Sequence, residues 1–150
     1  MADVYIKKGY PLKASQLIER ISSSKISFNQ RNELNYRLAA YYCKYGHQGQ
    51  CDEIVGRIIG PKKDADAYMQ LSYAFYNSEA NKEAITLLKQ CISLYPQYKE
   101  PYLLMGVILG NEGRYEESIN WWKQGLAIDP ADSRFVSNIN DAENLMNKGH

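Results

Sequence analysis

Apolar and small residues recur every three or four positions between Lys99 and Asp132, which is the spacing of amphipathic helices. Gly113 interrupts the pattern and Pro130 ends it, so two helices joined by a turn are predicted. The residues that share one helical face are Tyr102, Met105, Gly106 and Leu109 in the first helix, and Ser118, Trp122, Gly125 and Leu126 in the second. This stretch is therefore predicted to fold as a helix hairpin.

The same order of large and small residues occurs one period earlier, from Ala65 to Tyr98. Counted from Ala65 to Lys99, the period is 34 residues. The corresponding positions are Tyr68, Leu71, Ser72, Phe75, Ala84, Leu88, Cys91 and Pro96. A fixed period of this length indicates a stack of helix hairpins, in which each hairpin buries its apolar face against its neighbours.

The rest of the chain is expected to supply less regular units of the same array within a single domain. The predicted units are 1–31 (a partial repeat), 32–64 (a divergent repeat), 65–98 and 99–132 (two full repeats) and 133–147 (a helix that caps the end). In the partial repeat, Gly9 is the expected turn and Pro11 suits the first turn of the second helix, where a missing N–H costs nothing. The last helix is expected to cover the apolar end of the array with its polar side outward, and the residues expected to pack are Phe135, Val136, Ile139, Ala142 and Met146.

The divergent repeat matches the pattern more weakly. Ser27 and Gln30 have the spacing of a capping box for a helix over 28–45, and a partner helix is predicted over 50–59. The turn between them contains His47, which has no neighbour that would orient it as a base, so an exposed turn histidine is expected rather than a catalytic one.

The composition is that of a folded globular protein, with 45% hydrophobic and 23% charged residues in a chain of 150. No apolar run is long enough to span a bilayer, so no membrane insertion is expected. The N-terminus lacks the apolar core of a secretory signal. Cytoplasm is therefore the default expectation, although a chain whose leader had been removed would look the same.

The net charge of +1 conceals an asymmetry along the chain. Up to Asp64 there are 11 basic and 6 acidic residues, whereas from Ala65 onward there are 7 basic and 11 acidic. The electric field of such an uneven charge distribution can steer a partner or favour head-to-tail association. The alternative is that these charges belong to solvated helix faces. Nucleic acid is not expected as a partner, because no dense basic cluster is interleaved with aromatic residues.

The three cysteines are odd in number and lack the spacing of metal ligands, so neither a disulfide framework nor a metal site is predicted. Cys51 and Cys91 fall at packing positions, where a small buried thiol fills space. Cys43 falls at a groove position, either as inert lining or as a reactive thiol.

The two repeats over 65–132 closely resemble the tetratricopeptide repeat family, and the first 65 residues resemble it loosely. The resemblance implies an all-α fold, a solenoid of antiparallel helix hairpins wound into a right-handed superhelix, with a C-terminal capping helix. It also implies a concave groove that binds peptides or partner proteins. It implies no chemistry, so no enzymatic activity and no cofactor is expected.

In the geometry that the resemblance implies, residues of the first helix of each hairpin that are not used for packing face the groove. These residues are Tyr36, Ala40, Cys43, Asp66, Met69, Tyr73, Tyr76, Glu100, Leu103 and Val107. The predicted surface is apolar and aromatic with an acidic edge. Its apolar area exceeds the area that soluble monomers usually expose. An apolar or amphipathic segment of a partner protein is the expected occupant. The alternative is that a missing N-terminal helix or a neighbouring protomer fills the groove.

Two functional hypotheses follow, and both are non-enzymatic. The first is a scaffold or adaptor that presents its groove to a segment of another protein. The second is a dedicated chaperone that keeps a secreted or assembly-bound subunit soluble. Self-association is expected as an alternative, because the first helix is short and the two ends carry opposite charge.

Overall fold

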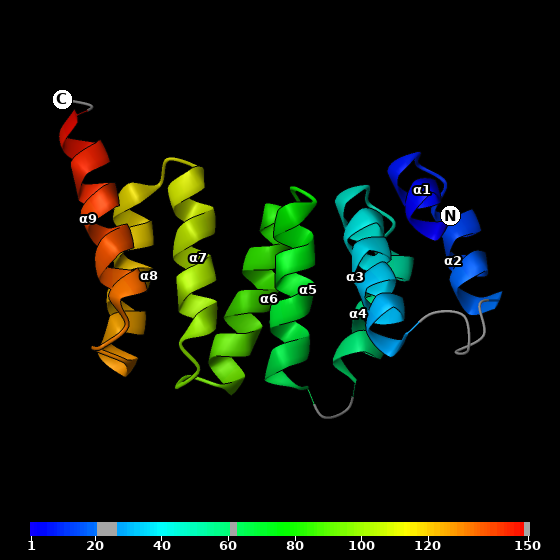
Figure 1. The fold of residues 1–150 in the computed structure, drawn as a ribbon, viewed down its shortest axis with the longest axis horizontal. Helices are drawn as coiled ribbons and strands as arrows, with labels where there is room; N and C mark the ends of the chain where they lie inside the picture. Colours follow the sequence, from blue (N-terminus) through cyan, green and yellow to red (C-terminus); the bar gives the residue numbers. More distant parts are fainter. Residues whose placement is uncertain (21–26, 61–62, 149–150) are drawn as a thin grey trace. The chain divides into compact units, whose positions relative to one another are not determined.

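The computed structural model describes residues 1–20, 27–60 and 63–148. Within these ranges every regular element is an α-helix, and no strand is present (Figure 1). By contacts within the chain, these residues form two compact units, Met1–Ala84 and Ile85–His150. In the part of the chain described, no helix combines the length and the apolar character needed to cross a membrane.

The first unit contains paired antiparallel helices joined by short turns (Figure 1). They are α1 (Ala2–Lys7), α2 (Pro11–Arg20), α3 (Phe28–Lys44), α4 (Gln48–Ile59) and α5 (Ala65–Asn77), and α6 (Asn81–Leu94) begins in this unit and ends in the second. α3 packs against α1, α2, α4 and α5, so it is the central helix of the unit.

The start signals read from the sequence act as expected in this unit. α2 begins at Pro11, and Gly9 makes the preceding turn with a φ of 77°, which favours glycine. At the start of α3, Ser27 Oγ accepts a hydrogen bond from the Gln30 N–H at 3.2 Å, and Gln30 Oε1 accepts one from the Ser27 N–H at 2.9 Å. The predicted capping box is therefore confirmed.

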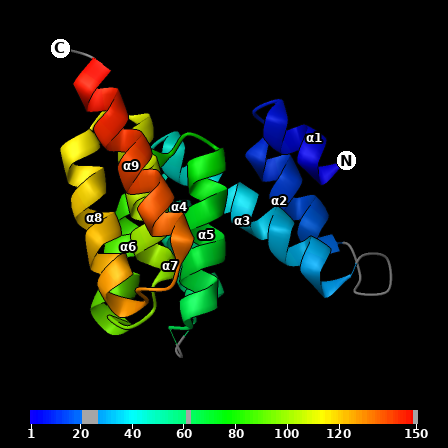
Figure 2. The ribbon, with the colours of Figure 1, turned by 60° about the vertical axis from the view of Figure 1, so that its left-hand side comes forward.

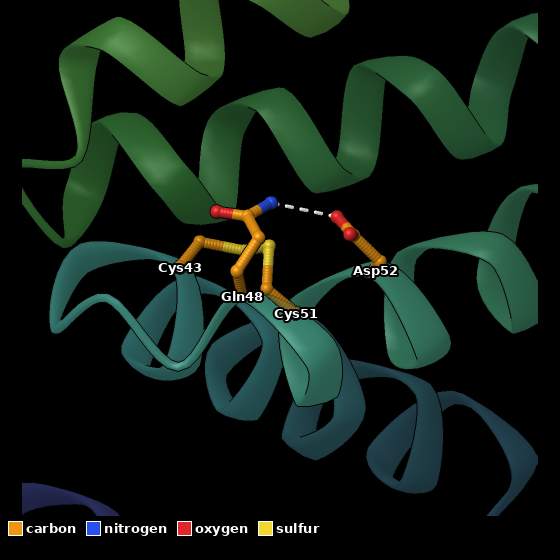
Figure 3. The surroundings of a disulfide bond; sticks show 4 residues. All are labelled: Cys43, Gln48, Cys51 and Asp52. Carbon is orange, nitrogen blue, oxygen red and sulfur yellow. Dashed lines mark hydrogen bonds between the residues drawn. A yellow bond between two sulfur atoms is a disulfide. The ribbon is translucent and has the colours of Figure 1, made fainter.

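A disulfide bond joins the end of α3 to the start of α4, between Cys43 and Cys51 (Figure 3). The prediction that this chain has no disulfide is wrong for this pair. Gly46 turns the chain between the two helices with a φ of 75°, and this reversal brings residues that are eight positions apart to a Cα–Cα distance of 4.9 Å. Cys91, in contrast, is buried at a packing position and is not part of a disulfide, as expected.

The second unit contains the second full hairpin and the last helix: α7 (Glu100–Asn111), α8 (Tyr115–Ile128) and α9 (Ser133–Lys148). The helix expected over 133–147 is present as α9. It packs on α8 and also touches α7 (Figure 2). Asp132 Oδ1 accepts a hydrogen bond from the Arg134 N–H at 3.1 Å and so caps α9. The core of this unit consists of Tyr102, Ile119, Trp122, Phe135, Ile139 and Ala142.

Most periodic positions of both full repeats are buried, whereas Pro96 is exposed and Leu126 is half-buried. The buried positions are Tyr68, Leu71, Ser72, Phe75, Ala84, Leu88 and Cys91, then Tyr102, Met105, Gly106, Leu109, Ser118, Trp122 and Gly125. Gly125 shows why small residues are needed: a Cβ there would overlap the ring of Phe135 on α9. One expectation on α9 is wrong, because Val136 was assigned to packing and is 43% exposed.

Candidate partner-binding surface

In the first unit, the first helices of consecutive hairpins, α3 and α5, lie side by side and line a pocket of about 480 Å³. The residues that line this α3–α5 pocket are Glu33, Tyr36, Arg37, Gln70, Tyr73, Ala74, Asn77 and Ser78. The lining of the pocket therefore combines two tyrosines with polar side chains. The prediction of an apolar wall needs correction here, because charged and amide side chains from both helices share the pocket with the aromatic rings.

Two of the predicted groove residues line this pocket. Tyr36 comes from α3 and Tyr73 from α5, and Tyr73 is 40% exposed. Tyr76 is half-buried further along α5, and Asp66 is exposed in the first turn of that helix, where its N–H donates to the Asp64 carboxylate. The pair Tyr36 and Tyr73 supplies the accessible aromatic surface of the pocket.

Three other predicted groove residues are covered by the protein itself. Ala40, Cys43 and Met69 are buried, and Cys43 is part of the disulfide bond. Ala40 and Cys43 lie on α3, which has neighbours on several sides, so few of its faces stay open. Met69 lies on α5, which packs against α3 and α4. We therefore leave these three residues out of the surface that a partner would touch.

A second pocket, of about 450 Å³, lies between α1 and α3 and was not predicted. Its lining residues are Ile6, Lys8, Gly9, Arg37, Tyr41, Lys44, Tyr45 and Ser78. Lys44 Nζ donates to the Ser78 carbonyl oxygen at 2.8 Å and to Glu79 Oε2 at 3.1 Å, which ties the end of α3 to the end of α5. The spacing of Arg37, Tyr41 and Lys44, by four and three residues, places them on one helical face and was the available signal.

Burial and a nearby charge both favour the neutral form of Tyr36. Partial burial raises the pKa of its phenol, and the negative charge of Asp64 raises it further. A phenol is already neutral at physiological pH, and these effects reinforce that state, so the hydroxyl keeps its hydrogen for donation. Tyr36 thus offers a partner both an apolar ring and a hydrogen-bond donor.

In the second unit, the predicted residue Glu100 is engaged by a residue that was not predicted. Arg134 of α9 forms two hydrogen bonds with the Glu100 carboxylate, at 2.7 Å and 3.1 Å. This bidentate pair joins the starts of α7 and α9. Glu100 therefore helps to position the helices and is not a free acidic edge.

A cluster of charges next to this pair fixes the loop before α9. Lys99 forms ion pairs with Asp129 and with Asp132, the latter at 2.8 Å. Hydrogen bonds from Arg134 and then from Lys99 hold the pKa of Asp132 well below its usual range. The pKa of Lys99 is raised by its hydrogen bonds to Asp129 and Asp132. These groups stay charged near neutral pH and anchor the turn.

The other two predicted residues of the second unit, Leu103 and Val107, are half-buried on α7 and pack against the core. Val107 also lines a pocket of about 240 Å³ between α7, α8 and α9, the α7–α9 pocket. Its lining residues are Val107, Gly110, Asn111, Tyr115, Trp122, Asn138, Asp141, Ala142 and Leu145. The contribution of α9 was not predicted, although Asn138, Asp141 and Leu145 have the three- and four-residue spacing of one helical face.

His47 lies at the start of α4, as the sequence predicted for an exposed turn residue. Its ring meets the ring of Tyr42 edge-on, with 5.8 Å between the ring centres. In the described ranges, no three or more histidine, cysteine, aspartate or glutamate side chains are placed to hold a metal ion.

The comparison with protein families decides the class of the helix hairpins. Residues 65–98 and 100–132 match the family described as tetratricopeptide repeat. The chain carries tetratricopeptide repeats. The matched segments coincide with the hairpin pattern read from the sequence, and the all-α, helix-hairpin solenoid class expected from that pattern is confirmed.

Solved structures of MamA, a tetratricopeptide-containing protein, share this fold. A crystal structure of MamA matches with a TM-score of 0.58 at 20% identity, over 98% of this chain and 85% of that chain. A structure of MamA MSR-1 gives 0.55 at 20% identity, over 97% and 83%. The MamA RS-1 ArsTM double mutant gives 0.54 at 13% identity, over 94% and 78%. At these identities the likeness shows the fold alone. No curated protein sequence matches the chain.

Tetratricopeptide repeats and this fold support a protein–protein interaction scaffold. Fold alone does not define a partner, so the identity of the binding surface has to be argued from the residues that the two units expose.

Proposed function

We propose that the chain is a non-enzymatic scaffold that binds an amphipathic segment of a partner protein along its first helices. In the first unit the contacts come from Tyr36 and Tyr73 in the α3–α5 pocket. The second unit offers a separate contact surface, formed by Leu103 and Val107 on α7. The α3–α5 pocket is the observation that carries this proposal, because it combines about 480 Å³ of space with accessible aromatic rings.

The chemistry of the α3–α5 pocket supports an amphipathic partner over a wholly apolar one. Tyrosine contributes large contact area at low entropic cost and is enriched at the energetic centres of interfaces. Arg37 and Gln70 line the same pocket and offer hydrogen-bond donors to polar groups of the partner. A helix or strand with one apolar and one polar side satisfies both kinds of group.

Photo-crosslinking tests this proposal at single residues. A benzophenone amino acid is introduced in place of Tyr73 in one protein and in place of Tyr10 in another, and both are irradiated in native lysate. Tyr10 is the matched control, since it is 52% exposed, is also a tyrosine and lines neither the α3–α5 pocket nor the pocket between α1 and α3. We expect one discrete protein adduct at position 73 and none at position 10. Equal adducts at both positions, or none at 73, would contradict the proposal.

A dedicated chaperone would bind its client through the same surface. It would differ from a scaffold in how the partner behaves when it is expressed alone. A client of a chaperone is expected to aggregate when expressed without this chain and to purify with it in a fixed ratio. A partner of a scaffold stays folded by itself. Solubility of the crosslinked partner, expressed with and without the chain, separates the two.

The disulfide bond Cys43–Cys51 disfavours the cytoplasmic location expected from the sequence. Disulfide bonds persist mainly in oxidising compartments and are rare in the cytosol, and the structure contains the bond Cys43–Cys51. We infer that the scaffold operates where this bond stays closed.

A further inference from the structure

The α7–α9 pocket of the second unit has a deep apolar floor. Trp122 and Ala142 are buried beneath it, and Val107 forms one side. Trp122 Nε1 donates to the Leu103 carbonyl oxygen at 3.1 Å, so the polar edge of the indole is satisfied inside the protein. Gly110 has no side chain to cover the far edge of the ring, where a Cβ would stand 3.4 Å from the indole. The edge of the ring next to residue 110 therefore lacks a covering side chain there, while the indole as a whole is 5% exposed.

The size of the pocket matches one large side chain. Its volume is about 240 Å³. An apolar cavity of roughly 150 Å³ in another protein accommodates benzene. The α7–α9 pocket thus has room for the ring of a phenylalanine or for a branched aliphatic side chain.

The rim of the pocket adds one apolar and one charged group, both from α9. Leu145 is 51% exposed on the rim, and Asp141 is exposed beside it. Within the described residues, no cation pairs with Asp141, whereas Glu100 and Asp132 on the same pair of helices are each paired with Arg134. The pocket therefore has an apolar floor and one uncompensated negative charge at its edge.

We propose that the α7–α9 pocket takes one large apolar side chain of a partner segment, and that Asp141 pairs with a lysine or arginine of that segment. The basic residue lies within about one helical turn of the apolar one. This inference rests on the proposed function, because it specifies which segment the scaffold binds. The charge at the rim is what selects the partner: an acidic neighbour of the anchor would be repelled and a basic one attracted.

Panning a phage-displayed library of random dodecapeptides tests the inference. The baits are the wild type, Asp141→Lys, Leu145→Glu, Tyr73→Asp and, as matched control, Val136→Glu. Val136 lies two and a half turns before Leu145 on the same helix, hence on the opposite face, and is similarly exposed. All four substituted positions are exposed, so the variants are expected to keep the helix content of the wild type, which circular dichroism checks.

The wild type and Val136→Glu are expected to enrich peptides with a large apolar residue and a nearby lysine or arginine. Asp141→Lys is expected to enrich aspartate or glutamate at that place instead. Peptides selected on the wild type should bind Leu145→Glu at least about tenfold more weakly, a difference of about 1.4 kcal/mol. Reversal of the preferred charge is a result that a purely structural role of Asp141 would not produce.

Three results would overturn the inference. If Asp141→Lys enriches the same peptides as the wild type, while Tyr73→Asp loses them, the proposed function stands and the α7–α9 pocket is not the site. If the wild type enriches no peptide, both the proposed function and this inference fail. If the wild type is a dimer in light scattering and Leu145→Glu is a monomer, the occupant is a second copy of the chain.

Discussion

The indole of Trp122 on α8 lies against the backbone of Gly106 on α7, in the space that a Cβ at residue 106 would fill. The ring is held there by its hydrogen bond to the Leu103 carbonyl oxygen. Because the ring is buried and bonded, it has little freedom to move aside. This close approach of two helices sets the geometry of the hairpin and, through Trp122, the floor of the α7–α9 pocket.

Gly106→Ala is expected to lower the free energy of unfolding by about 1–3 kcal/mol, because the new methyl group overlaps the indole. Gly56→Ala is the matched control: Gly56 lies in α4, and nothing stands within 4 Å of a Cβ placed there. Removing a helical glycine at such a site should stabilise by up to about 1 kcal/mol. Urea denaturation followed by circular dichroism measures both. Equal changes in the free energy of unfolding of the two variants would show that a methyl group at residue 106 does not clash with the indole of Trp122.

Much of the helix array was predictable because its signals are local and periodic. The alternation of large and small residues is repeated in 65–98 and 99–132, and burial of positions such as Ser72 and Trp122 follows from it. Pro11 and the capping box at Ser27 set helix starts through contacts within one turn, which sequence spacing captures.

The candidate surface was predicted less well, since it depends on contacts between helices that spacing alone does not reveal. Met69 was assigned to the groove by its offset but is buried under neighbouring helices. Arg134 and Leu145 were missed because a capping helix has no repeat against which to align it. The bond of Cys43 to Cys51 was missed because three cysteines gave no even set, and only the turn at Gly46 brings this pair together.

Reduction of the disulfide bond is expected to destabilise the first unit. Opening a loop closed by residues eight positions apart should lower the free energy of unfolding by about 2–3 kcal/mol, mainly by freeing the unfolded chain. The measurement is thermal unfolding with and without dithiothreitol. The double variant Cys43→Ala with Cys51→Ala should unfold at the same temperature in both conditions.

Thiol counting checks the same bond independently. In denaturant without reductant, one reactive thiol per chain is expected, that of Cys91. After reduction three are expected. Three thiols before reduction would show that Cys43 and Cys51 are not joined.

Low pH is expected to lower the stability of the second unit, because it protonates the carboxylate of Asp132. Hydrogen bonds from Arg134 and Lys99 lower its pKa in the folded protein relative to the unfolded chain. A lowered folded pKa means that the stabilisation is complete above the unfolded pKa of about 4 and is lost as the pH falls toward the folded value. Asp132→Asn should therefore unfold at a lower temperature than the wild type near neutral pH, and the gap should narrow below about pH 4.

The control for this prediction is Asp141→Asn on α9, a carboxylate that is exposed and has no ion pair with any described residue. Its unfolding temperature should follow that of the wild type at every pH. A gap between Asp132→Asn and the wild type that stays constant into acid would contradict the assigned role of the charged Asp132.

The most direct test of the account is the affinity of the crosslinked partner for a single-residue variant of the α3–α5 pocket. Isothermal titration calorimetry compares the wild type, Tyr73→Asp and the control Tyr10→Asp, in which the new aspartate directly precedes α2 and is favoured by the helix dipole. If Tyr73 is a central contact, its loss should cost about 2 kcal/mol, roughly a thirtyfold rise in Kd, with Tyr10→Asp unchanged. An unchanged Kd for Tyr73→Asp would contradict binding along the first helices.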